Sequence, residues 1–409
     1  MSAQLRPVQA ELIGKIAKEN GFDEYKVETS SGSIKGDNFL GIVTTVCVKN
    51  DDKTLELILK SAHESETFRK AAPLREAYLR EIYLYENVFS QFDKYQNDYN
   101  VEDPFKSYAK LYGCNKDDGN ECLVMENLKT QGYQLWNKHN PMNPGHISAV
   151  LKEYAKFHAT NIAMKHNDPD AYENLVSSIS KNIFELADDE KTSREKFQLF
   201  LKSTFDIGYK TVDGEPELID YLKTLENDFP ALFFDELSQP EYKTTLIHGD
   251  CWCNNVLFKY EDSADKTKPS NVKIIDWQIS HVTSPAYDYC YFFLVHSSKE
   301  ILEDYRSYLK LYYEAFSKHL KCFNCDPEEV FSYSRFLNHI EKFMKFGVYM
   351  CLMILKVVLC DSDEAPDFSQ AKDEMAMFES MNFEFKNYDV YRKRIKDLVT
   401  FMKDTKFTE

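Results

Sequence analysis

The sequence predicts an α+β fold built as two lobes of unequal size, and three observations support this. Strand patterns crowd the first 126 residues, helical patterns dominate the remainder, and two short polar motifs lie among short strands in the larger part. The chain has 409 residues, which is enough for two compact units. We place the boundary after Glu126, giving an N-terminal lobe at 1–126 and a C-terminal lobe at 127–409.

The N-terminal lobe is predicted to begin with a helix and to continue as an antiparallel sheet. Residues 4–21 have helical periodicity that ends at Gly21, and residues 25–31, 42–49 and 54–60 have the patterns of strands. The last of these segments alternates apolar and polar side chains, as a half-buried strand does. We therefore expect its side chains to point alternately to the two faces of the sheet.

One helix of this lobe, predicted over 73–89, carries a carboxylate in an unexpected place. Its apolar residues fall on one stripe at helical spacing, and Glu81 lies on that stripe. A carboxylate on an apolar face is costly unless a cation meets it. Lys60, at the end of the third predicted strand, is the natural partner, and Glu76 is a rival to Glu81 that is less well placed on the stripe. A further short strand is expected at 122–125.

The C-terminal lobe is predicted to be mostly helical, with short strands only around the polar motifs. Helices are expected at 147–164, 192–205, 217–229, 300–320 and 328–359. The motif region 244–277 has the pattern of short strands and loops, and 261–270 is a polar loop within it.

Composition excludes some classes of function. The net charge is -17, whereas a nucleic-acid-binding protein normally presents a basic face. The most apolar stretch, 346–355, is about half the length that a membrane span needs. The ten cysteines are scattered, which favours free thiols in a reducing compartment. We expect a cytoplasmic protein with no nucleic-acid partner, no membrane span and no obligate protein partner.

The most informative residues are His248-Gly249-Asp250 with Asn255, followed by Asp276 after an apolar strand. A phosphotransferase needs one carboxylate to receive a hydroxyl proton, and an amide and a second carboxylate to hold magnesium on ATP. We assign Asp250 as the base and Asn255 and Asp276 as the magnesium ligands. His248 is expected to be structural. The predicted cofactors are ATP and Mg²⁺.

Other parts of the nucleotide site are predicted in the N-terminal lobe. Lys60 would grip the α- and β-phosphates, with Glu81 as its ion-pair partner. Gly36 and Asn38 lie in a loop that would cover the phosphates, although an ordinary hairpin loop is an equal alternative. Met125 and Glu126 would link the lobes and present backbone groups to adenine.

Together these residues resemble the aminoglycoside phosphotransferase and choline kinase superfamily, which shares the protein-kinase-like bilobal fold. More narrowly, the chain resembles the insect ecdysteroid kinase-like family over about residues 25–360. The segments that carry this narrower resemblance are Lys35-Gly36-Asp37-Asn38-Phe39, Arg80-Glu81-Ile82-Tyr83, Leu123-Val124-Met125-Glu126-Asn127-Leu128, Lys156-Phe157-His158-Ala159 and Asp276-Trp277-Gln278. The resemblance implies the same roles for Lys60, Glu81, Asp250, Asn255 and Asp276, and a bracing role for Asp288.

The resemblance implies a small-molecule O-kinase that phosphorylates a hydroxyl of a steroid-like compound, such as an ecdysteroid, or of a related metabolite. Two alternatives stay open: a non-catalytic carrier of small molecules on a kinase scaffold, and a kinase for choline- or ethanolamine-type amino alcohols. A protein kinase ranks last, because the chain reaches Pro285 soon after Asp276 and leaves little room for an activation segment.

Overall fold

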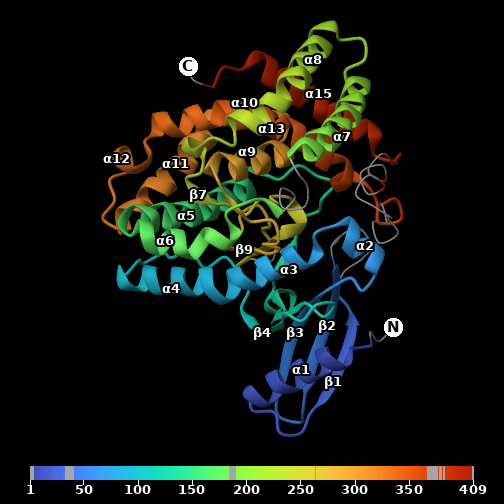
Figure 1. Cartoon of the computed structure of the whole chain (residues 1–409), viewed down its shortest axis with the longest axis vertical. Helices are drawn as coiled ribbons and strands as arrows, with labels where there is room; N and C mark the ends of the chain where they lie inside the picture. Colours follow the sequence, from blue (N-terminus) through green and yellow to red (C-terminus); the bar gives the residue numbers. More distant parts are fainter. Residues whose placement is uncertain are drawn as a thin grey trace.

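The computed structural model describes residues 4–32, 41–183, 190–262, 264–365, 376, 380 and 383–407. These residues form a small lobe around a sheet and a larger lobe of helices, which follow one another along the long axis of the molecule (Figure 1). The predicted α+β class, with an antiparallel sheet in the small N-terminal part and a mostly helical C-terminal part, is confirmed. The boundary after Glu126 stays a prediction.

The sheet of the small lobe positions Lys60. In the described residues it has the order β1 (Lys26–Ser31), β2 (Gly41–Lys49), β3 (Thr54–Ala62), β5 (Cys122–Glu126) and β4 (Leu111–Asn115), with every neighbouring pair antiparallel. Leu57 and Leu59 of β3 pack in the cluster under helix α1 (Pro7–Glu19), whereas Ile58 and Lys60 line a pocket on the other face. This alternation follows from the two-residue period of a strand.

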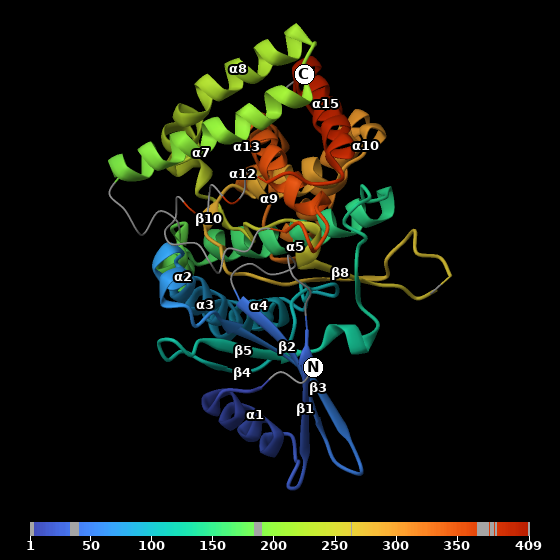
Figure 2. The same cartoon turned by 90° about the vertical axis from the view of Figure 1, so that its right-hand side faces the viewer.

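Helix α3 (Leu74–Tyr83) covers the face of the sheet opposite α1 (Figure 2). The helix predicted over 73–89 does not stop at its expected end, because residues 84–98 contain no glycine or proline to break it. It continues through a π-helical turn (Leu84–Val88) into α4 (Phe89–Asp98). Phe92 of α4 packs against Phe157 of the large lobe, so the hydrophobic core runs from α3 into the C-terminal helices.

The large lobe is built from the following elements, given in chain order. They are η2 (Leu128–Gln131), β6 (Gln134–Leu135), α5 (Pro144–Asn167), α6 (Pro169–Val176), η3 (Ser177–Ile179), α7 (Glu190–Thr211), α8 (Pro216–Ala231), η5 (Leu232–Glu236), η6 (Pro240–Tyr242), β7 (Thr245–Leu246), η7 (Cys253–Asn255), β8 (Val256–Lys259), β9 (Asn271–Ile274), β10 (Val282–Thr283), α9 (Pro285–His296), α10 (Lys299–Glu303), α11 (Tyr305–Cys322), α12 (Pro327–Phe331), α13 (Tyr333–Leu359) and α15 (Tyr388–Asp404).

Two helices predicted as continuous are each divided in the structure. The helix expected over 300–320 is interrupted at Asp304, between α10 and α11. The helix expected over 328–359 is interrupted at Ser332, whose extended backbone ends α12 and whose hydroxyl accepts the N–H of Arg335 at 3.2 Å. Serine is a preferred N-cap because its oxygen satisfies a free amide of the first turn, so the local chemistry favours a new helix start.

Two short ladders bring the polar motifs together. Strand β8 pairs with β9, and β7 pairs with β10, both antiparallel. The loop between β7 and β8 and the turn between β9 and β10 therefore lie side by side, and these carry the two motifs. Within the described residues, every helix falls short of the length or apolarity needed to cross a bilayer.

Candidate active site

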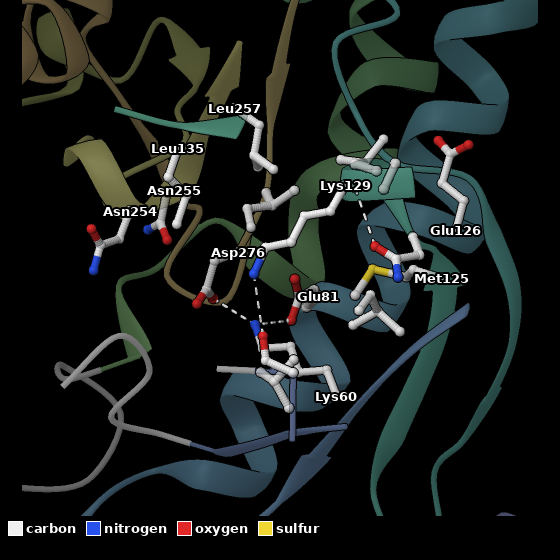
Figure 3. A pocket seen from close by; sticks show the side chains of 17 residues that line it. Lys60, Glu81, Met125, Glu126, Lys129, Leu135, Asn254, Asn255, Leu257 and Asp276 are labelled. Carbon is white, nitrogen blue, oxygen red and sulfur yellow. Dashed lines mark hydrogen bonds and ion pairs between the residues drawn. The ribbon is translucent and has the colours of Figure 1, made fainter. Parts of the chain in front are cut away.

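Lys60 lies between two carboxylates at the interface of the lobes (Figure 3). Its ammonium nitrogen is 2.7 Å from Glu81 Oε2 and 2.7 Å from Asp276 Oδ1. Strand β3 supplies the lysine, helix α3 the glutamate, and the turn after β9 the aspartate. Lys60 and Glu81 are buried, whereas Glu76, the rival partner, is exposed on the far side of α3. The structure therefore brings together Lys60 and the carboxylate on the apolar stripe.

The surroundings of Lys60 keep it positively charged. Burial lowers its pKa, but the negative charges and hydrogen bonds of Asp276 and Glu81 outweigh this, so the pKa lies above its ordinary value. A buried ammonium needs such partners, since an unpaired charge in the interior is very costly. In protein kinases the same lysine–glutamate pair presents the lysine to the α- and β-phosphates of ATP.

Asp276 has an uncommon backbone conformation. Its φ is 66°, in the left-handed region that few non-glycine residues adopt. Adjacent hydrogen bonds hold the turn: the N–H of Trp277 donates to Glu81 Oε1 at 3.2 Å, and the N–H of Ile275 donates to the carbonyl of Asn255 at 2.9 Å. The Asp276 side chain remains 21% exposed and lines the pocket. Strain that neighbouring bonds maintain in this way points to a functional carboxylate.

Asp250 and Asn255 face each other across the loop after β7. The amide nitrogen of Asn255 donates to Asp250 Oδ2 at 2.8 Å and to its carbonyl oxygen at 3.0 Å. The hydroxyl of Tyr291 on α9 donates to Asp250 Oδ1 at 3.3 Å. Burial, together with the nearby charge of Asp276, raises the pKa of Asp250 to about 7. A carboxylate with this pKa can accept a proton near neutral pH.

The tight turn before Asp250 requires glycine. Gly249 has φ of 90°, and a Cβ placed on it would lie 2.8 Å from the carbonyl oxygen of Ile279. Asp288 braces the same turn, because its carboxylate accepts the main-chain N–H of His248 at 2.7 Å and that of Gly249 at 2.9 Å. His158 Nε2 lies 3.0 Å from Asp288 Oδ2, the same oxygen that accepts the His248 N–H. Asp288 is therefore placed to brace the loop, the role implied for it by the resemblance.

His248 also lies where a structural role is expected. Its ring is fully buried, with Nε2 3.0 Å from the carbonyl oxygen of Ile275 and the ring packed against Trp277. Through these contacts it ties the Asp250 loop to the Asp276 turn. Burial, in addition, lowers the pKa of His248, which favours the neutral imidazole.

Three residues around these loops received no role from the sequence. Tyr291 contacts Asp250, and His158 and Tyr312 extend the network behind Asp288, with Tyr312 Oη 2.7 Å from His158 Nδ1. His158 lies in one of the segments that carry the family resemblance, but that resemblance assigned it no role. For Tyr291 and Tyr312 the sequence offered only a polar atom on a largely apolar helix, which a buried core residue would also give. Their partners are far away along the chain, so only the folded structure reveals the contacts.

The cysteines near the loop are shielded from solvent. Cys251 is fully buried and donates to Asp288 Oδ1 at 3.1 Å, and Cys253 is 1% exposed. Burial keeps the pKa of Cys251 well above its ordinary value, which disfavours the reactive thiolate. The described residues also include no group of three or more His, Cys, Asp or Glu side chains arranged to hold a metal.

A pocket of about 880 Å³ lies between the lobes, and most of the candidate residues line it (Figure 3). These are Lys60, Glu81, Met125, Glu126, Asn255 and Asp276, whereas Asp250 lies behind Asn255. At one end, apolar side chains of β2, β3, β5 and β8 line the pocket. At the other end lie Lys60, Asn255 and Asp276. Met125 and Glu126 line the pocket, and the Glu126 carboxylate accepts the N–H of Lys110 at 2.8 Å. The contact of their backbone groups with adenine stays a prediction. Gly36 and Asn38 lie outside the described residues.

A second lysine reaches into this pocket, and the sequence did not single it out. Lys129 follows the segment that links the lobes, and its ammonium nitrogen lies 3.4 Å from the carbonyl oxygen of Gly32 on the opposite wall (Figure 3). Together with Lys60 it gives the pocket two cations in a chain whose net charge is -17. Because the described lining also includes the carboxylates of Glu81, Glu126 and Asp276, a polyphosphate would rely on magnesium together with the two lysines.

The donor set fits magnesium. Asp276 offers a carboxylate oxygen, and the amide nitrogen of Asn255 is engaged by Asp250, so the amide oxygen is the atom left for a metal. Magnesium in nucleotide sites takes one or two protein oxygens and completes its shell with phosphate and water. Two protein ligands are thus sufficient, and a cluster of three or more acidic or sulfur ligands is not required.

Fold and site together define a small-molecule kinase-like protein. The chain belongs to the ecdysteroid kinase-like family, whose profile matches residues 35–325. Among solved structures, an ethanolamine kinase from Plasmodium vivax matches with 15% sequence identity and a TM-score of 0.39, covering 92% of this chain and 85% of that chain. A comparison with curated protein sequences gives no match.

Proposed function

We propose that this chain is an ATP- and magnesium-dependent kinase that phosphorylates a hydroxyl group on a steroid-like small molecule, such as an ecdysteroid, or on a related metabolite. The main support is that Lys60, Glu81, Asn255 and Asp276 line a single pocket. Asp250 lies beside them, because its carboxylate accepts the side-chain amide of Asn255. Membership of the ecdysteroid kinase-like family supports the steroid-like acceptor class.

In this proposal Asp250 aligns the acceptor hydroxyl and receives its proton. The acceptor oxygen then forms a bond to the γ-phosphorus of ATP, and the bond from that phosphorus to the β,γ-bridging oxygen breaks. ADP leaves with the electron pair, and the proton on Asp250 passes to solvent after the phosphate ester departs. The transferring group needs little covalent help, so positioning and charge stabilisation supply most of the catalysis.

The other residues hold the nucleotide for this transfer. Lys60 would contact the α- and β-phosphates while Glu81 keeps its ammonium in place. Asp276 and Asn255 would hold magnesium, which neutralises charge on the phosphate oxygens. Lys129 would add a second cation near the opening of the pocket. Strand β10 begins at Val282 and α9 at Pro285, so the described segment after Asp276 has little room for the activation segment of a protein kinase.

The test is turnover by the purified full chain with Mg-ATP and a panel of sterols, ecdysteroids and amino alcohols. We expect ADP and a phosphate ester to form in equal amounts with at least one acceptor, and Asp250→Asn to abolish both. Equal ADP formation by the wild type and the Asp250→Asn variant across the panel would refute a base role. Stabilisation by sterols without any response to Mg-ATP in thermal unfolding would instead favour a carrier.

A further inference from the structure

A second pocket lies in the large lobe, separate from the nucleotide pocket. It is lined by residues of β10, η5 and α13 and the segments beside them, and it encloses about 610 Å³, part of it open to solvent. The two pockets share no lining residue among those described.

Helix α9 connects this pocket to the proposed base. Tyr287 lines the pocket, and Tyr291, four residues later, donates its hydroxyl to Asp250 Oδ1. Residues four apart lie on the same helix face, about one turn or 5.4 Å from each other. Burial raises the pKa of Tyr287, and the charges of Cys251, Asp288 and Asp250 add to this effect in that order. The pocket and the Asp250 carboxylate are thus connected through two tyrosines on one face of α9.

One wall of the pocket is aromatic. The ring of Tyr287 packs against that of Phe346 with centroids 4.5 Å apart, and against that of His281 at 5.5 Å. Phe343 completes this wall. Aromatic walls of this kind bury an apolar ligand body, while a few polar groups, here including Thr283 and Ser238, orient it.

The charged side chains among the described lining residues are of one sign. Lys181 and Lys243 line it, and none of the described lining residues is aspartate or glutamate. A site for a quaternary or primary ammonium combines aromatic faces with negative charge, because the cation must be compensated. Two lysines would instead repel such a ligand. An uncharged or anionic molecule fits this lining better.

We infer that this second pocket binds the phosphoryl acceptor, and that the acceptor is an uncharged or anionic alcohol with a broad apolar body, not an amino alcohol. This inference rests on the proposed function, and it adds the binding site of the acceptor and the charge of the acceptor molecule. The nucleotide would enter from the pocket between the lobes and the acceptor from the side of β10. The two reactants would meet at Asp250.

The test fills the pocket without touching the catalytic residues. Ser238 is an exposed serine whose hydroxyl donates to a nearby carbonyl, that of Phe234, and Ser238→Trp would occupy the pocket. Ser270 is its matched control, since it is also exposed and donates to a carbonyl, that of Lys259, but lies on the loop between β8 and β9. The probes are ecdysone, cholesterol, choline and ethanolamine, each with Mg-ATP and the full chain.

We expect ecdysone or cholesterol, but neither amino alcohol, to be phosphorylated. Ser238→Trp should lower kcat/KM for that acceptor by about tenfold or more, with the KM for ATP unchanged, because misplacing the acceptor by even 1 Å is costly. Ser270→Trp should match the wild type. Normal acceptor kinetics in Ser238→Trp, while Asp250→Asn is inactive, would overturn the pocket assignment and leave the proposed function standing. Faster turnover of choline or ethanolamine would overturn the charge argument.

If the wild type phosphorylates none of the four probes, binding alone decides the assignment. Ecdysone or cholesterol should then raise the Tm of the wild type and of Ser270→Trp but not of Ser238→Trp. That result would support the pocket while the proposed function fails. No shift of the wild-type Tm with either sterol would overturn the pocket assignment as well.

Discussion

Replacement of Lys60 by methionine should destabilise the fold as well as abolish nucleotide binding. The substitution removes the ammonium that lies 2.7 Å from Glu81 Oε2, and Glu81 is fully buried. Breaking a buried ion pair by removing one partner costs about 3–5 kcal/mol. Asp276 is partly exposed, so water can hydrate its carboxylate when the lysine is removed. Glu81 still accepts a hydrogen bond from the N–H of Trp277. We therefore expect a loss at the lower end, about 3 kcal/mol in the free energy of unfolding at pH 8.

The loss should depend on pH in a direction set by Glu81. Without Lys60, burial raises the pKa of the Glu81 carboxyl in the folded state above its value in the unfolded chain. A group of this kind stabilises the fold when protonated at low pH, and that stability is lost as the pH rises through the folded pKa. The free energy of unfolding that Lys60→Met loses relative to the wild type should thus be smaller at pH 5.5 than at pH 8.

Urea unfolding of matched variants measures this prediction. The double variant Lys60→Met/Glu81→Met should recover to within about 1 kcal/mol of the wild type, because well-packed apolar replacements of a buried pair are often neutral. It should still fail to bind Mg-ATP. The control is Lys49→Met, which breaks an exposed ion pair with Glu28 on the same sheet and should cost at most about 1 kcal/mol. A Lys60→Met variant as stable as Lys49→Met at pH 8 would refute the reasoning.

Three further predictions concern the Asp250 loop. Gly249→Ala would force a Cβ to within 2.8 Å of the Ile279 carbonyl oxygen at φ of 90°, so we expect about 1–3 kcal/mol less stability and a lower kcat, measured by urea unfolding and initial rates. Asp288→Asn keeps the shape of the side chain but weakens the acceptor of two main-chain N–H groups. The kcat should fall about tenfold or more with the KM for ATP unchanged. An equal loss of ATP affinity would indicate that the nucleotide site is disrupted as well. Because Asp250 must be ionised to accept a proton and its pKa is raised to about 7, kcat/KM for the acceptor should fall as the pH drops below 7; a rate independent of pH between 5.5 and 8 would contradict a base with that pKa.

The sequence was sufficient for features set by local pattern. The alternation over 54–60 correctly placed Lys60 on one face of β3, and the helical spacing placed Glu81 on a buried stripe. A glycine directly before Asp250 is typical of a tight turn, and Gly249 has a φ of 90°. In each case a period of two residues, a helical period or one glycine determines the local geometry.

Features set by tertiary packing could not be predicted in the same way. Strand β4 (Leu111–Asn115) is short and contains a glycine, so it gives no strand pattern of its own and exists because it pairs with β5. Tyr291 and Lys129 reach the site from α9 and from the segment after β5, and no local pattern distinguishes them from other tyrosines and lysines. The second pocket is likewise assembled from distant segments, so its aromatic wall is not visible in the order of residues.

The central claim is transfer of the γ-phosphoryl group to a small molecule with Asp250 as the base. The most direct measurement incubates the full chain with γ-¹⁸O-labelled ATP and a small-molecule extract, and follows the label by mass spectrometry. We predict that the wild type places the label in a phosphate ester of an apolar alcohol, and that Asp250→Asn places none. Label found only in inorganic phosphate or in protein, or equal labelling by the two forms, would contradict the account.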